Sequence, residues 1–127
     1  MFFYHVGFMG AGFLALFIGG VVARYGKRQR WWLKVHRGLA YGGVLMALAG
    51  FAFMFIGKTD SHFRVPHAWL GAVVILLAVA TPVLGNLLFI LRERAAALRT
   101  LHRWSGRTTL ILMGLNIISG LFVAGIL

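Results

Sequence analysis

The stretch VPHAWLGAVVILLAVATPVLGNLLFIL, residues 65–91, contains no Asp, Glu, Lys or Arg and is almost entirely apolar. An α-helix rises about 1.5 Å per residue, so roughly 20 such residues cross the ~30 Å hydrocarbon core of a bilayer. Comparable uncharged runs cover residues 2–23, 38–57 and 108–127. The sequence therefore predicts an all-α membrane protein, a four-transmembrane-helix up-and-down bundle.

The composition agrees with this class, because 61% of the residues are hydrophobic and the mean hydropathy is +0.88. Strands of a membrane barrel need only about 10 alternating residues, whereas these runs are twice as long and do not alternate. The loops are too short for a soluble domain, so we expect one domain over residues 1–127. No basic residue precedes the first run, and we expect it to stay in the membrane as a helix.

The net charge of +11 lies next to the apolar runs, which argues against a nucleic-acid-binding face on a soluble domain. Of the 13 basic residues, six lie between the first and second runs, two between the second and third, and five between the third and fourth. By the positive-inside rule, the first and third loops face the cytoplasm and both termini lie outside it. We expect an integral protein of a bacterial inner membrane, in contact with lipid.

Two absences restrict the chemistry. The chain has no cysteine, which excludes iron–sulfur clusters and covalently attached c-type haem. The only acidic residues are Asp60 and Glu93, both in loops, so no carboxylate is available in the membrane to couple to a cation or to orient a catalytic histidine. The polar residues within the runs, Asn116 and Ser119 among them, are expected to form hydrogen bonds between helices.

The histidines are the residues best suited to chemistry. His5, His36, His67 and His102 fall at or near the start of the four predicted helices, at spacings of 31, 31 and 35 residues. Because successive helices run in opposite directions, His5 and His67 share the outer level and His36 and His102 the inner level. One imidazole from each of two helices can ligate a b-type haem iron, so we predict two non-covalent b-type haems. His62, in the outer loop, is not expected to be a ligand.

Small residues follow three of these histidines by four positions, where a porphyrin would approach the helix backbone. They are Ala40, Gly71 and Gly106, while the corresponding position after His5 is Met9. Close helix packing accounts equally well for any one of these glycines.

Charged residues near the two levels are candidates for binding anions. At the inner level, cationic side chains can form charge-assisted hydrogen bonds with haem propionates. These candidates are Lys34, Arg37, Arg99, Arg103 and Arg107. In the outer loop, His62 and Arg64 are candidates for contacting an anionic donor or acceptor.

The chain resembles the four-helix haem-binding core of the cytochrome b561 family, in the form found beside DOMON domains in ferric-reductase-like proteins. The resemblance is carried by HVGFM (5–9), GVVARY (20–25), KVHR (34–37), HAWLG (67–71), TPVLG (81–85), LHRWSGR (101–107) and GLNIISG (114–120). It implies the same two histidine pairs, and electron transfer between carriers on opposite faces. Better-known members use ascorbate-like donors, and ferric chelates or oxidised ascorbate as acceptors.

The flanking helices of the six-helix members and the DOMON domain are not found in this chain, so we expect a separate redox partner protein or small electron carrier on each face. A transmembrane electron-transfer oxidoreductase is the favoured interpretation. The sequence leaves open a structural or quinol-reactive haem subunit of a larger membrane complex, and equally a homodimer. The direction of electron flow is not determined by the residues.

Overall fold

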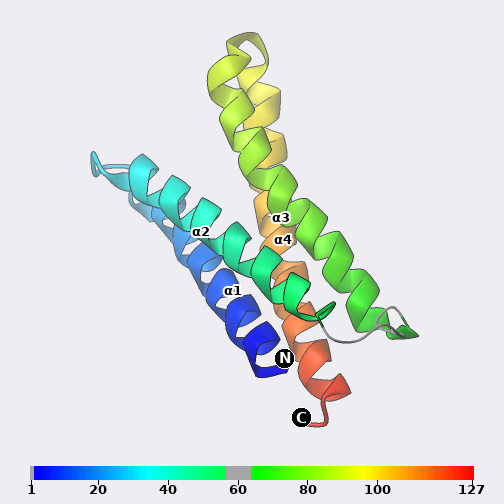
Figure 1. Cartoon of the computed structure of the whole chain (residues 1–127). Helices are drawn as coiled ribbons and strands as arrows, with labels where there is room; N and C mark the ends of the chain where they lie inside the picture. Colours follow the sequence, from blue (N-terminus) through cyan, green and yellow to red (C-terminus); the bar gives the residue numbers. More distant parts are fainter. Residues whose placement is uncertain (1, 57–63) are drawn as a thin grey trace.

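The computed structural model describes residues 2–56 and 64–127, and all regular structure in these two ranges is helical. Its elements are α1 (Phe2–Tyr25), α2 (Trp32–Phe53), α3 (Pro66–Ile90), the short 3₁₀ helix η2 (Arg92–Arg94) and α4 (Ala95–Val123), shown in Figure 1. The predicted all-α class is therefore confirmed.

Two helices begin well before the apolar runs that predicted them. Helix α2 starts at Trp32 and α4 at Ala95, within basic sequence. Lysine and arginine favour helix nearly as well as alanine does, so a helix can continue past the point where its hydropathy falls. His102 consequently lies about two turns inside α4, whereas the sequence placed it at or near the helix start.

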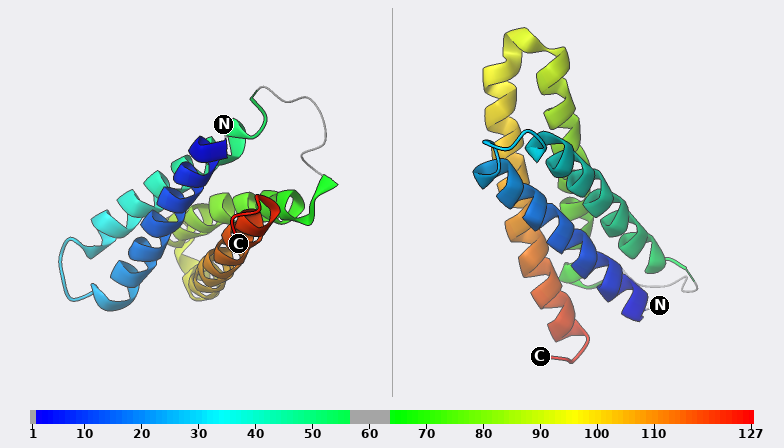
Figure 2. Two further views of the ribbon diagram at one scale, coloured as in Figure 1. Left: turned by 90° about the horizontal axis from the view of Figure 1, so that it is seen from below. Right: turned by 90° about the vertical axis from the view of Figure 1, so that its left-hand side faces the viewer.

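The four helices form two antiparallel hairpins, α1–α2 and α3–α4, which cross one another (Figures 1 and 2). The hairpins meet through contacts of α2 with α3 and of α1 with α4. Across the two diagonals, no Cα atom of α1 lies within 8 Å of α3, and none of α2 lies within 8 Å of α4. The chain ends lie at the end of the bundle opposite the α1–α2 and α3–α4 turns, as an up-and-down order requires (Figure 1).

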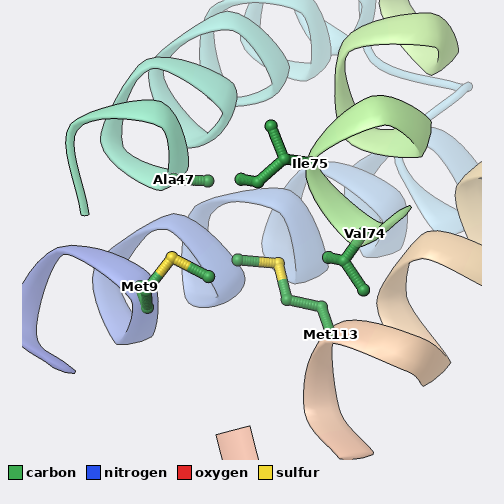
Figure 3. Packing of buried hydrophobic residues seen from close by; sticks show 5 residues of the cluster. All are labelled: Met9, Ala47, Val74, Ile75 and Met113. Atoms are coloured by element: carbon green, nitrogen blue, oxygen red, sulfur yellow. The ribbon is translucent and has the colours of Figure 1, made fainter. Parts of the chain in front are cut away.

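A small apolar core lies where the hairpins cross, and every helix contributes to it (Figure 3). Its buried members are Met9, Ala47, Val74, Ile75 and Met113. The α1–α2 hairpin is tight because it has glycine at the contact: a Cβ built on Gly12 would lie 2.9 Å from the Gly43 carbonyl oxygen. Most large apolar side chains point outward instead, as expected for surfaces in contact with lipid.

Within the described residues, three segments are long and apolar enough to cross a membrane: Phe2–Tyr25, Pro66–Ile90 and Arg92–Val123. Helix α2 does not qualify, since Lys34, His36 and Arg37 in its first turns lower its hydropathy. Three of the four expected spans are thus supported, and the fourth stays a prediction.

Candidate functional site

The four helix-borne histidines come together in two pairs. The ring centroids of His5 and His67 are 6.3 Å apart, and those of His36 and His102 are 6.0 Å apart. All four side chains are half-buried. Each pair joins diagonal helices whose backbones do not touch, so the imidazoles extend toward each other across the bundle interior.

The spacing within each pair suits one metal ion between two rings. An imidazole nitrogen lies about 2 Å from a bound transition metal and the ring centre roughly 1 Å farther, so two imidazoles on opposite sides of one ion have centroids about 6 Å apart. The described residues contain no group of three or more His, Cys, Asp or Glu side chains that would hold an ion without further ligands. Two histidines complete the coordination of a porphyrin iron, and the donor set therefore fits a haem.

Three of the four histidines are held by a backbone carbonyl of the neighbouring helix in their own hairpin. The bonds run from Nδ1 of His5 to Gly50 (2.8 Å), of His36 to Gly19 (2.8 Å) and of His102 to Thr81 (2.9 Å). A carbonyl oxygen only accepts, so Nδ1 carries the proton and Nε2 keeps its lone pair. This is the tautomer that a metal ligand needs, with a hydrogen bond that fixes the ring orientation.

The fourth histidine, His67, is held by a side chain. Its Nδ1 lies 3.2 Å from Ser119 Oγ, and that hydroxyl donates to the Asn116 carbonyl oxygen at 3.0 Å. Because the single hydroxyl proton is used on Asn116, Ser119 accepts from Nδ1. His67 therefore also presents a free Nε2 lone pair.

Glycines provide the space in which the rings lie. A Cβ built on Gly120 would be 2.7 Å from His67 Cε1, and one on Gly85 would be 3.1 Å from His102 Cε1. At Gly19 the nearest His36 ring atom would be 3.8 Å away. Any larger residue at Gly120 would push the His67 ring from its position.

The sequence carries a signal for these glycines in their spacing from the histidines. Gly19 follows His5 by 14 residues and Gly50 follows His36 by 14, while Gly85 and Gly120 follow His67 and His102 by 18. These intervals are close to four and five helical turns, so each helix carries a histidine and a glycine on roughly one face. Each helix thus supplies a ligand at one level and a packing surface for a histidine at the other.

The small residues expected beside a porphyrin have other neighbours here. The Cβ positions of Gly71 and Gly106 face Asn116 Nδ2 (3.1 Å) and Thr81 Cγ2 (3.6 Å), and Ala40 is half-buried. Met9 belongs to the apolar core. Contact of Ala40, Gly71 and Gly106 with a porphyrin stays a prediction.

The inner-level cations are exposed and fall into two groups. Lys34 and Arg37 on α2 line an open pocket of about 540 Å³ together with Arg30, Leu33 and Tyr41. Arg99, Arg103 and Arg107 lie on α4, and the Arg107 guanidinium is 5.4 Å from the centre of the Trp104 ring.

Arg37 is partly ordered by α3. Its Nη2 donates to Asn86 Oδ1 at 3.2 Å, as does the Tyr41 hydroxyl at 2.8 Å, and its guanidinium lies 5.8 Å from the Phe89 ring centre. At the opposite end of the bundle, Arg64 is exposed just before α3, and His62 lies outside the described residues.

Comparison with known protein families gives a match over most of the chain. The family model described as Eukaryotic cytochrome b561 matches residues 4–121. No curated protein and no solved structure gives a match. A eukaryotic family offers no support for the expected bacterial inner membrane. Since the match covers nearly all of the chain and includes all four paired histidines, this protein belongs to the cytochrome b561 family, membrane proteins that bind b-type haem and transfer electrons across the bilayer.

Proposed function

We propose that this chain is a di-haem cytochrome with His5 and His67 as axial ligands of an outer haem and His36 and His102 as those of an inner haem. The observation that carries the proposal is that both pairs have the separation of two imidazoles on one iron, with every Nδ1 in a hydrogen bond. A bound b-type haem supplies a one-electron iron couple at each level.

The depth of the two levels supports electron transfer across the membrane. Along α1 and α3, the levels are marked by His5 and Gly19 and by His67 and Gly85, which are 14 and 18 residues apart. At ~1.5 Å per residue these intervals correspond to roughly 21 to 27 Å. The buried apolar core, which includes Ala47, Val74 and Met113, lies between them along the helices. One haem in each half of the bilayer would connect carriers on opposite faces.

Helix α2 is proposed as the fourth span. It has 22 residues, or about 33 Å of helix, and it pairs with α1 over its length. His36 belongs to one histidine level, and Gly50 on the same helix accepts the hydrogen bond from His5 at the other. A helix that reaches both levels crosses as much of the bilayer as its neighbours do.

Electron carriers on the two faces would meet different surfaces. We propose that Lys34, Arg37, Arg99, Arg103 and Arg107 hold the propionates of the inner haem and that His62 and Arg64 contact an anionic carrier outside. The whole of residues 1–127 acts as one domain, with a separate protein or small molecule as redox partner on each face.

Both termini are proposed to lie outside the cytoplasm, because 11 of the 13 basic residues lie in the α1–α2 and α3–α4 connections and their flanks. A reporter that is active only in the cytoplasm should stay silent when fused after Leu127. The same reporter inserted between Lys27 and Arg28 should be active. The opposite pattern would reverse the assignment of the two faces.

The proposal predicts two b-type haems per polypeptide in protein purified from haem-sufficient cells. Haem extraction into acidified organic solvent, with protein measured by amino-acid analysis, gives the ratio, and visible spectra should show low-spin, six-coordinate iron. The solvent should extract all of the haem, because the chain has no cysteine to which haem could be covalently attached. A ratio of one would leave only one of the two pairs as a haem site, and a ratio of zero would favour a structural subunit.

A further inference from the structure

The two histidine levels differ in how their ligands are held. At the inner level both Nδ1 atoms donate to backbone carbonyls, at 2.8 Å for His36 and 2.9 Å for His102. At the outer level His5 does the same at 2.8 Å, but His67 donates to the Ser119 hydroxyl at 3.2 Å. His67 is therefore the one of the four that has a side-chain hydroxyl as a partner of Nδ1, with Asn116 as a further hydrogen-bond partner of the ring, and a substitution can remove the hydroxyl without altering the backbone.

The orientation of Ser119 is itself determined by its neighbours. Its hydroxyl donates to the Asn116 carbonyl oxygen in the preceding turn of α4, so its lone pairs face the His67 ring. Gly120 allows the ring to lie against this turn. The arrangement keeps the ring proton on Nδ1, which donates to Ser119. If Ser119 donated to Nδ1 instead, the ring proton would lie on Nε2.

The partner of Nδ1 affects how strongly Nε2 binds a metal. A hydrogen bond from Nδ1–H to a good acceptor raises the basicity of the imidazole, which stabilises ferric over ferrous iron and lowers the reduction potential. A backbone carbonyl at 2.8 Å is a stronger acceptor than a hydroxyl at 3.2 Å, because hydrogen-bond strength falls with distance. The hydrogen bond from Nδ1 of His67 to Ser119 is accordingly the longest and weakest of the four.

We propose that Ser119 is a positioning residue that sets the basicity of His67 and thereby the reduction potential of the outer haem. This inference rests on the proposed function, since it requires His67 to be an axial ligand. It goes beyond that function by stating what sets the reduction potential at each level. A replaceable side-chain hydroxyl contributes at the outer haem, whereas both inner ligands donate to main-chain carbonyls.

The test is a redox titration of purified haem-loaded protein carrying Ser119→Ala. Loss of the Ser119 hydroxyl weakens the hydrogen bonding of Nδ1 and should make the outer haem easier to reduce, with about a threefold higher ratio of reduced to oxidised haem at a fixed ambient potential. At 59 mV per tenfold for a one-electron couple, this corresponds to a rise of ~28 mV. Ser119→Thr keeps a hydroxyl and should retain the wild-type value.

Ser105→Ala is the matched control. It removes a hydroxyl from the same helix, one that forms a hydrogen bond with Thr81 Oγ1 at 2.6 Å and, within the described residues, none with a histidine ring. It should leave the outer haem's potential unchanged. An unchanged or lowered potential in Ser119→Ala, or an equal shift in Ser105→Ala, would overturn the role of Ser119. Absence of haem from the wild-type protein would instead overturn the proposed function.

Discussion

Replacement of His67 by alanine is expected to remove one of the two haems and to leave the other with its wild-type spectrum and potential. His67 lies 6.3 Å from His5, and a haem that loses one of two axial ligands loses much of its binding free energy. His5→Ala should remove the same spectral component. Haem-to-protein ratios and redox titrations of the single variants measure this, with bound haem falling to about half.

His36→Ala and His102→Ala should each remove the other component. Neighbouring helices are antiparallel, so His5 and His36 lie at levels that are roughly 21 to 27 Å apart. No side chain is long enough to bring both imidazoles to one iron. His62→Ala is the control, because it removes an imidazole without removing a proposed ligand, and both haems should stay. Loss of one spectral component in both His5→Ala and His36→Ala would refute the two-level arrangement.

Gly120→Ala is expected to decrease occupancy of the outer haem by on the order of tenfold, which is about 1.4 kcal/mol of binding free energy. The new methyl group would lie 2.7 Å from His67 Cε1, closer than packed atoms approach, so the imidazole must move. Movement of the ring would displace Nε2, the atom proposed to bind the haem iron. Haem retention during dialysis against a haem-binding protein such as apomyoglobin provides the measurement.

Two other glycine-to-alanine variants serve as controls for Gly120→Ala. Gly85→Ala brings a methyl group to 3.1 Å from His102 Cε1 and should have a smaller effect, confined to the inner haem. Gly42→Ala meets nothing within 4 Å and should stabilise α2 by up to about 1 kcal/mol without loss of haem. If Gly120→Ala retained both haems as well as Gly42→Ala does, Gly120 would not be needed to seat His67.

Helix boundaries show where sequence reasoning was limited. The predicted run at 108–127 corresponds to a helix that begins at Ala95, because hydropathy reports which residues prefer lipid and not which residues are helical. The pairing of His102 with His36 was nevertheless anticipated, since it depends on the order and direction of the helices and not on where each one starts.

The sequence by itself determined the helical class and the alternating direction of the helices, because the lengths of the apolar runs and their order are properties of the chain that can be read locally. Only the tertiary structure decided what holds each imidazole: Gly50, Gly19 and Thr81 through their carbonyls, and Ser119 through its hydroxyl. These partners lie on neighbouring helices, and their positions depend on how each helix is rotated about its axis and how closely two glycine-bearing faces approach. That rotation is set by packing between helices, which a pattern along one helix does not specify.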